Sequence, residues 1–189
     1  MIRRPGRNAG GTDLTALEYR RANRQYTAIP KDEVWRFVDS REKLYVAFPM
    51  ENGYPHVTPV WFCVLDKKLY LRTQDYKMKT RLAKAGKACC ALDEGRRYVE
   101  LRGVVIWGRS GVVTDQKLVD RIEKIMGMKY KEQQWRASEM PTWWVQERKH
   151  EKRAYIEITP TKISSWDNSR IHRLSAQKAN PRGAPVAHR

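Results

Sequence analysis

The segment Tyr54–Gly95 constrains the fold of this 189-residue chain more than any other part of it. A long apolar run at 56–65 passes through a short polar connection at 66–68 into a second apolar run at 68–73. A very basic stretch follows, and then a third apolar run at 87–93. The runs are rich in β-branched and aromatic residues, and the short connection is typical of a hairpin. The segment therefore predicts the order strand, strand, basic helix, strand.

The basic stretch predicts a short helix over 76–85, with Asp75 as a candidate N-cap and Gly86 at its C-terminal cap. A helix that begins just after a strand presents unpaired amides, and added cations make such a junction favourable for an anion. Thr73, at the end of the preceding strand, would add a hydroxyl. We therefore expect a phosphate-binding site here, formed by Lys77, Lys79, Arg81 and Lys84. The competing interpretation is a solvated cationic helix face, which is common in a basic protein.

Pro59 interrupts the first strand of this segment. Proline has no amide N–H to donate, so the strand is expected to be edge-like or locally bulged at that point. Backbone groups left free beside it would be available to a planar ligand. The alternative is that the proline protects an edge strand against aggregation. The sequence leaves both interpretations open.

The remaining elements complete a mainly β pattern. They are a helix that begins after Pro30, a strand at 43–48, a long strand at 98–113, a helix from Thr114 or Asp115, and last strands at 153–159 and 162–166. Most strands are joined by hairpins, and no alternation of strand and helix typical of a parallel sheet occurs. Glycines at 103, 108 and 111 suggest bends of the long strand at a barrel corner. The sequence predicts about six strands in an antiparallel barrel with helices on its flanks.

The chain length favours one domain with tails. We expect the domain to span 31–169, preceded by a basic segment at 1–30 with a helix at 14–26, and followed by a basic tail at 170–189. Within the domain, the Trp-rich stretch 128–152 lacks a clean period and predicts an inserted helix and loop. Its tryptophans would pack in the core or at an interface, or would cover a pocket.

Charge and composition exclude several classes of protein. Residues 1–30 carry a net charge of +4 and residues 170–189 of +5, out of +17 for the whole chain. More than half of the basic excess thus lies in the tails, which offer the only route to nucleic acid, because no RNA-recognition motif is present. No stretch approaches the roughly 20 apolar residues that span a bilayer, and the N-terminus lacks the pattern of a signal peptide. We therefore expect a cytoplasmic protein without membrane association.

Side chains that usually carry catalysis or bind metals form no recognisable motif. The three cysteines do not have the spacing of a disulfide framework, and core packing in a reducing compartment explains them best. The four histidines show no ligand spacing, so no metal site is expected. Nucleophile elbows, Walker loops and dinucleotide fingerprints are also missing from the sequence. The sequence therefore hints at a phosphorylated cofactor instead of a side-chain catalyst.

Five pieces, taken together and in order, resemble the FMN-binding split barrels. This superfamily comprises the pyridoxamine 5′-phosphate oxidase-like proteins and the flavin/deazaflavin oxidoreductases. The matching pieces lie at 53–62, 69–84, 87–95, 98–105 and 158–167. The chain looks most similar to the actinobacterial subgroup that includes users of coenzyme F-420, a deazaflavin. The resemblance covers about residues 40–170.

The resemblance implies a six-stranded antiparallel split barrel that forms a homodimer, with two cofactor sites at the seam. It implies that the cofactor is F-420 or FMN, because both share a phosphoribityl arm. The phosphate would contact the basic helix and the ring would lie against the second strand, with an aromatic residue near the cofactor and a basic run near the substrate. In this sequence the phosphate would contact Lys77, Lys79, Arg81 and Thr73, and the ring would lie against Val57, Thr58, Pro59 and Val60. The aromatic residue near the cofactor would be Trp166, and the residues near the substrate would be Arg170 and His172.

Two departures from the family pattern bear on the substrate and the phosphate. The basic run after Trp166 follows a shorter spacer than in true pyridoxamine phosphate oxidases, and its final arginine is displaced. Met78 stands where relatives often have a lysine. Which cation binds the phosphate is therefore left open.

The sequence thus favours a flavoprotein-like oxidoreductase that transfers hydride between bound F-420 or FMN and an unsaturated small-molecule substrate. Two alternatives belong to other classes. One is a flavin- or deazaflavin-binding carrier or sensor without turnover. The other is a nucleic-acid-associated protein that uses its basic tails.

Overall fold

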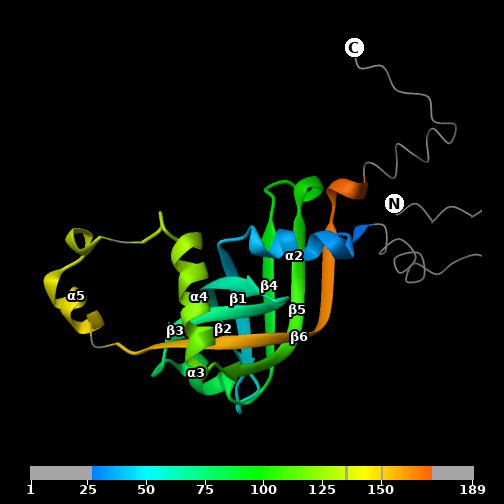
Figure 1. Cartoon of the computed structure of the whole chain (residues 1–189). Helices are drawn as coiled ribbons and strands as arrows, with labels where there is room; N and C mark the ends of the chain where they lie inside the picture. Colours follow the sequence, from blue (N-terminus) through cyan, green and yellow to red (C-terminus); the bar gives the residue numbers. More distant parts are fainter. Residues whose placement is uncertain (1–26, 135, 150, 172–189) are drawn as a thin grey trace, which may run out of the picture. The chain divides into compact units, whose positions relative to one another are not determined.

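The computed structural model describes residues 27–134, 136–149 and 151–171 (Figure 1). The predicted helix at 14–26 and most of the two basic tails lie outside these residues. The strands are β1 (Lys43–Pro49), β2 (Pro55–Leu65), β3 (Lys68–Gln74), β4 (Ala88–Glu94), β5 (Arg102–Val112) and β6 (Arg153–Asp167). The helices are α2 (Lys31–Asp39), α3 (Met78–Ala83), α4 (Gln116–Lys129) and α5 (Thr142–Lys149), with short 3-10 turns at Tyr98–Glu100 and Ala137–Glu139.

The six strands close into a barrel in the order β1-β2-β3-β6-β5-β4. The pairs β1–β2, β1–β4, β2–β3 and β3–β6 are all antiparallel. The predicted mainly β, six-stranded antiparallel barrel with flanking helices is therefore confirmed. The hairpin predicted at 66–68 is also confirmed, because Asp66 and Lys67 both have positive φ angles, of 52° and 57°. Two such residues form the turn whose twist matches that of the flanking strands.

The strands bury apolar side chains in the interior of the barrel. β1, for example, buries every second residue, and β3 buries almost all of its apolar ones. Burial of such side chains is the main favourable contribution to folding. The fully buried residues of the strands include Leu44, Val46, Phe48, Phe62, Leu69, Leu71, Ile106, Ile156 and Ile158.

Helix α4 covers the outer face of β2 and β3. Asp115 caps its N-terminus by accepting hydrogen bonds from the amides of Lys117 and Leu118, at 2.9 and 3.4 Å. The helix predicted from Thr114 or Asp115 is confirmed, and its apolar side packs into one cluster with outward-facing strand residues. The buried members of that cluster are Cys63, Tyr70, Ile122, Met126, Tyr130 and Tyr155.

The described chain divides into two compact units. One contains residues 31–92 and 104–164, and hence most of the barrel strands and helices α2 to α5. The other contains 93–103 and the described residues at 27–30 and 165–171. In this second unit a Cβ on Gly103 would overlap the indole of Trp166, so only glycine admits that ring. The domain boundaries that we expect from the sequence stay a prediction.

Helix α3 corrects the sequence prediction for 76–85. It spans only Met78–Ala83, and its N-cap is Lys77 without a side-chain hydrogen bond, so Asp75 is not the cap. The reason is that the Asp75 amide donates to the carbonyl of Lys152 at 3.1 Å, which holds residue 75 outside the helix. Gly86 has a φ of +79° just beyond the helix, as expected for a C-terminal cap.

Two further predictions for the strands need correction, and one of the two alternatives for Pro59 is excluded. The start of the predicted strand at 98–113 is a 3-10 turn, and β5 begins only at Arg102. The two last strands are one continuous strand, β6. Pro59 causes no bulge, because the register of β2 with β1 runs without interruption from Lys43↔Trp61 to Pro49↔Pro55.

Candidate functional site

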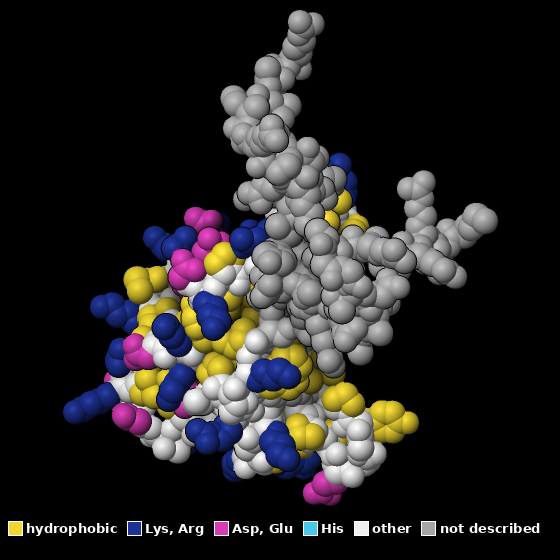
Figure 2. All heavy atoms as spheres, turned by 90° about the vertical axis from the view of Figure 1, so that its right-hand side faces the viewer, with side chains coloured by type: hydrophobic (Ala, Val, Ile, Leu, Met, Phe, Trp, Pro, Cys, Tyr) yellow, Lys and Arg dark blue, Asp and Glu magenta, His cyan; other side chains and the backbone are white. Residues whose placement is uncertain are grey.

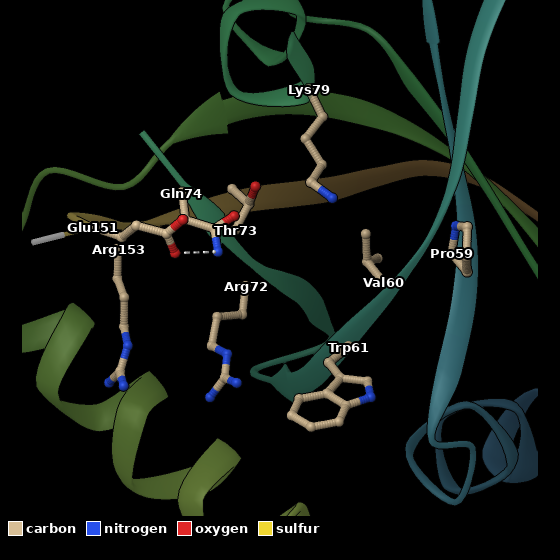
Figure 3. Close-up of a pocket in the computed structure, with 9 residues that line it drawn as sticks. All are labelled: Pro59, Val60, Trp61, Arg72, Thr73, Gln74, Lys79, Glu151 and Arg153. Atoms are coloured by element: carbon tan, nitrogen blue, oxygen red, sulfur yellow. Dashed lines mark hydrogen bonds between the residues drawn. The ribbon is translucent and has the colours of Figure 1, made fainter. Parts of the chain in front are cut away.

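The pairing of β2 with β3 stops halfway along the two strands. The ladder runs from Leu65↔Lys68 to Phe62↔Leu71 and ends there. The same register would next pair Trp61 with Arg72, Val60 with Thr73 and Pro59 with Gln74. These six residues instead line a pocket of about 330 Å³ between the strands, together with Lys79, Glu151 and Arg153 (Figure 3). We call this opening the β2–β3 split.

The two strands remain anchored on their outer sides at the split. β2 still pairs with β1 there, and β3 pairs with β6 as far as Gln74↔Arg153. Pro59 thus lies in the part of β2 that has a ladder partner on one side, so the edge-like interpretation is confirmed. A strand edge without a ladder partner presents N–H and C=O groups that a ligand can use.

Lys79 reaches into the split from α3 (Figure 3). Its side chain is half-buried, and no carboxylate among the described residues lies within ion-pair distance of it. Burial lowers the pKa of Lys79 below its ordinary value of 10.5, and the neighbouring Lys77 lowers the pKa further. A half-buried ammonium group without a negative charge beside it is energetically costly, and a bound anion would lower that cost.

Thr73, which lines the same pocket, carries an unsatisfied hydroxyl. The residue is only 5% exposed, and its Oγ1 atom is buried without a hydrogen-bond partner. Buried polar atoms in proteins are nearly always hydrogen-bonded, and an exception calls for an explanation such as a ligand. The neighbouring Thr80, by contrast, donates its hydroxyl to the carbonyl of Gln74 at 2.6 Å.

Trp61 and Arg72 form the other side of the split. The Arg72 guanidinium lies 5.0 Å from the centre of the Trp61 ring. That ring stacks on Tyr130, with the ring centres 4.7 Å apart and the planes 7° from parallel. The Tyr130 hydroxyl accepts a hydrogen bond from the Phe62 amide at 3.0 Å and lies 2.7 Å from the carbonyl oxygens of Glu42 and Phe62. This stack fixes Trp61 next to the opening.

Glu151 and Arg153 complete the rim. Glu151 accepts hydrogen bonds from Gln74 at 3.1 Å and from the Tyr76 hydroxyl at 2.6 Å. Arg153 pairs with Glu123 of α4 at 3.4 Å, and Glu123 also accepts from the Tyr155 hydroxyl at 2.9 Å. Both acids near the split are thus engaged by other side chains.

The structure brings together four of the residues that the sequence nominated. Pro59, Val60, Thr73 and Lys79 all line the split. Val57 and Thr58 lie earlier on β2; Val57 is exposed, and the Thr58 hydroxyl donates to the Pro59 carbonyl at 3.3 Å.

The other nominated residues lie elsewhere. The Lys77 ammonium lies 4.6 Å from the centre of the Tyr76 ring, and Arg81 is exposed on α3. Trp166 belongs to the second unit, as does Arg170, which donates to the Ala28 carbonyl at 3.4 Å. His172 lies outside the described residues.

Five further residues line the pocket and were not predicted from the sequence: Trp61, Arg72, Gln74, Glu151 and Arg153. An arginine at an outward position of the otherwise apolar strand 68–73 was the one available signal for Arg72. Glu151 and Arg153 are far from β2 in the sequence, and only the pairing of β6 with β3 brings them to the pocket.

Other kinds of site find less support within the described residues. Figure 2 shows lysine and arginine side chains spread between apolar ones over the described part of one face, instead of gathering in a stripe. Across the described ranges there is no cluster of metal-ligating side chains and no helix long and apolar enough to cross a membrane. The three cysteines are unbridged, and burial raises the pKa of Cys63 and of Cys90 to about 12. These two thiols therefore stay protonated at neutral pH.

Solved structures share this fold. A conserved hypothetical protein from Mycobacterium tuberculosis is 21% identical with a TM-score of 0.66, and the match covers 88% of this chain and 95% of that one. An FAD binding protein from Mycobacterium smegmatis is 15% identical with a TM-score of 0.53, over 74% and 97% of the two chains. A heme storage protein from Vibrio cholerae is 11% identical with a TM-score of 0.56, over 74% and 97%. At such identities the likeness extends to the fold alone.

A search of curated proteins found no match. The family model described as pyridoxamine 5′-phosphate oxidase, however, matches residues 30–165, which include every strand of the barrel except the last two residues of β6. The chain therefore belongs to the pyridoxamine 5′-phosphate oxidase-like family of split barrels.

Proposed function

We propose that this protein is an oxidoreductase that transfers hydride between bound F-420 or FMN and an unsaturated small-molecule substrate. The observation that carries the proposal is the pair formed by the buried, unpartnered Thr73 hydroxyl and the uncompensated Lys79 ammonium in one pocket. A phosphate would accept hydrogen bonds from both groups and relieve both costs. The FAD-binding relative from M. smegmatis supports a flavin-like ligand in this fold.

The residues present fit such a cofactor. A pocket of about 330 Å³ lies at the small end of the range of about 300–1,000 Å³ that is usual for ligands. It therefore suits the phosphate and part of the polyol chain, while the ring would lie outside it against the edge of β2 at Val57–Val60. Pro59 and the exposed Val57 would offer that ring an apolar surface.

The chain itself would act by binding and positioning. When bound, the cofactor supplies the hydride-transfer chemistry. Thr73 and Lys79 would hold the phosphate and thereby fix the position of the ring along β2. Lys77 and Arg81 would add to the positive potential around that phosphate. Trp166 would line the ring, and Arg170 and His172 would contact the substrate, as the family pattern implies.

We further propose that two copies associate through the outer face of β4, β1 and β2. That face is apolar and partly exposed: Tyr45 is 53% exposed and Val57 55%. Cross-strand pairing sets Tyr45 beside both Ala91 and Pro59, and Ala47 beside both Cys89 and Val57. Exposed apolar patches of this kind commonly mark protein interfaces. Light scattering after gel filtration tests this association. We expect the wild type to be a dimer and Tyr45→Glu to be a monomer. A wild-type monomer at micromolar concentration would contradict the proposal.

The proposed cofactor is tested by purification without added ligand, followed by an absorbance spectrum and fluorescence titration with FMN and with F-420. The double variant Lys79→Ala with Arg81→Ala should bind the phosphorylated ligand at least tenfold more weakly, since the charge-assisted hydrogen bond of Lys79 contributes about 1.5–3 kcal/mol and Arg81 adds to the positive potential around the phosphate. Lys117→Ala is the matched control, because Lys117 is an exposed cation on α4 that does not line the split. A wild-type protein that binds neither cofactor would refute the proposal.

Turnover separates an enzyme from a carrier. The protein loaded with reduced cofactor should be oxidised by electron-poor alkenes or imines in repeated cycles. Tight binding without oxidation by any member of such a panel would favour the carrier or sensor. In the cell we expect the cytoplasm, in keeping with three unbridged cysteines.

A further inference from the structure

A second cation in the β2–β3 split has no acidic partner. Arg72 is half-buried on β3, and none of its nitrogen atoms lies within ion-pair distance of a carboxylate among the described residues. Burial lowers its pKa and nearby Arg153 lowers the pKa further, while the more distant charge of Glu123 offsets part of this shift. A guanidinium has five N–H donors in a planar fork that matches a carboxylate or phosphate. The stacking on Trp61 fixes the plane of this fork but satisfies none of its donors.

Arg153 adds a second positive group on the same outer face of β3 and β6. Its cross-strand partner is Gln74, while Arg72 pairs with Tyr155 in the register, so the two arginines are diagonal neighbours. The nearby acids do not neutralise both. Glu123 lies within ion-pair distance of Arg153 and not of Arg72, and Glu151 is bound by Gln74 and Tyr76. Arg72 therefore has no carboxylate within ion-pair distance among the described residues, and Glu123 compensates its charge only from further away.

This cation is separate from the proposed phosphate site. Figure 3 shows Lys79 entering from α3, whereas the guanidinium groups of Arg72 and Arg153 lie on the opposite side, with Thr73 and Gln74 between. One phosphate bound to Thr73 and Lys79 would leave Arg72 uncompensated. The same pocket therefore presents two anion-binding groups set apart from each other.

We propose that Arg72, with Arg153 behind it, binds a second anionic group of the same cofactor, so that the split selects a phosphorylated ring cofactor with an acidic tail. This inference rests on the proposed function and specifies its ligand. F-420, whose tail carries carboxylates beyond the phosphate, and FAD, with its second phosphate, both have the required chemistry. FMN has its phosphate at the end of the chain and offers nothing to Arg72.

The test compares the affinities of riboflavin, FMN, FAD and F-420 for the wild type and for Arg72→Gln, measured by fluorescence titration without substrate. We expect Arg72→Gln to weaken the binding of F-420 or FAD by about tenfold or more and to change FMN binding less than twofold. Arg72→Lys keeps the charge and loses the planar fork, so its affinity for F-420 or FAD should lie between those of the wild type and Arg72→Gln. Thermal unfolding of each unliganded variant, and the shift that each ligand produces, give a second readout.

The outcomes distinguish the two claims. A wild type that binds none of the four ligands refutes the proposed function. A wild type that binds FMN as tightly as F-420 and FAD overturns the second site alone. Equal losses for FMN and the tailed cofactors in Arg72→Gln, or no loss for either, also overturn it. Unchanged selectivity in Lys117→Ala, which removes an exposed cation of α4 that does not line the split, would exclude a general effect of charge.

Discussion

The two halves of the β2–β3 hairpin are built from the same two strands but differ in strand pairing and in burial. In the half near the turn, the ladder is intact, and Phe62 and Leu71 are fully buried. On the outer side of that half, Cys63 and Tyr70 are covered by α4. In the other half the ladder stops, and a pocket opens between Pro59, Val60 and Trp61 of β2 and the charged and polar residues of β3. One half of the hairpin thus stabilises the fold, and the other half leaves its hydrogen-bonding groups available.

Contacts from outside the hairpin fix both strands at the transition between the halves. The Tyr130 hydroxyl bonds to the backbone of Phe62, the last β2 residue in the ladder, and the Tyr130 ring stacks under Trp61, the first residue beyond it. On β3, Thr80 of α3 binds the Gln74 carbonyl. We infer that unfilled hydrogen-bonding capacity, more than burial, marks the functional half.

The largest expected effect belongs to the paired half. Phe62→Ala removes a fully buried ring and leaves a cavity, so we expect a loss of about 3–5 kcal/mol in the free energy of unfolding. Urea denaturation measures it. A loss below about 1 kcal/mol would show that this half does not hold the fold.

Tyr130→Phe tests the boundary between the halves. It leaves the ring stack in place but removes the partner of the buried Phe62 amide, at an expected cost of about 1–3 kcal/mol in unfolding free energy. Burial already raises the pKa of Tyr130 to about 12, so this cost should not change between pH 6 and pH 9. Denaturation at both pH values checks the result, and Tyr98→Phe, at an exposed tyrosine, is the control.

Thr73→Val should separate function from stability in the open half. Valine has nearly the same shape and removes a hydroxyl that has no partner, so the unliganded protein should be as stable as the wild type or up to about 1 kcal/mol more stable. Affinity for FMN or F-420 should fall several-fold. A clear loss of stability without ligand would mean that the hydroxyl is already satisfied.

The pH dependence of phosphate binding should give the smallest effect. The depressed pKa of Lys79 means that its ammonium loses the proton below the ordinary value of 10.5. The affinity of FMN relative to riboflavin should therefore decrease as the pH rises from 7 towards 10. In Lys79→Arg, whose side chain stays charged, the ratio of FMN to riboflavin affinity should not change with pH across this range. An identical decline in Lys79→Arg would assign the titration to another group.

The fold was largely predictable from sequence because it follows from local patterns. The strand at 43–48, the apolar run at 68–73 and the polar connection at 66–68 correspond to β1, β3 and the hairpin. The failures occurred where a distant contact overrides the local signal. Asp75 looks like an N-cap, but its amide is bound to Lys152, which lies far away in the sequence.

The candidate site was predictable only in part. Thr73 and Lys79 could be nominated because they flank one strand-to-helix junction. Arg72, Glu151 and Arg153 could not, because their convergence depends on where the β2–β3 ladder ends and on the pairing of β6. The strand sequences carry no signal that the β2–β3 ladder ends at Phe62. Val60 and Trp61 have strand propensities as high as those of the paired residues 62–65.

The most direct test of the account is the ratio of FMN to riboflavin affinity, measured by calorimetry for the wild type and for Lys79→Met. The two ligands differ only in the phosphate, so the ratio isolates the claim that the β2–β3 split binds it. We predict a ratio of about ten or more in the wild type and a ratio near one in the variant. A wild-type ratio near one, or a ratio that survives in Lys79→Met, would contradict the account.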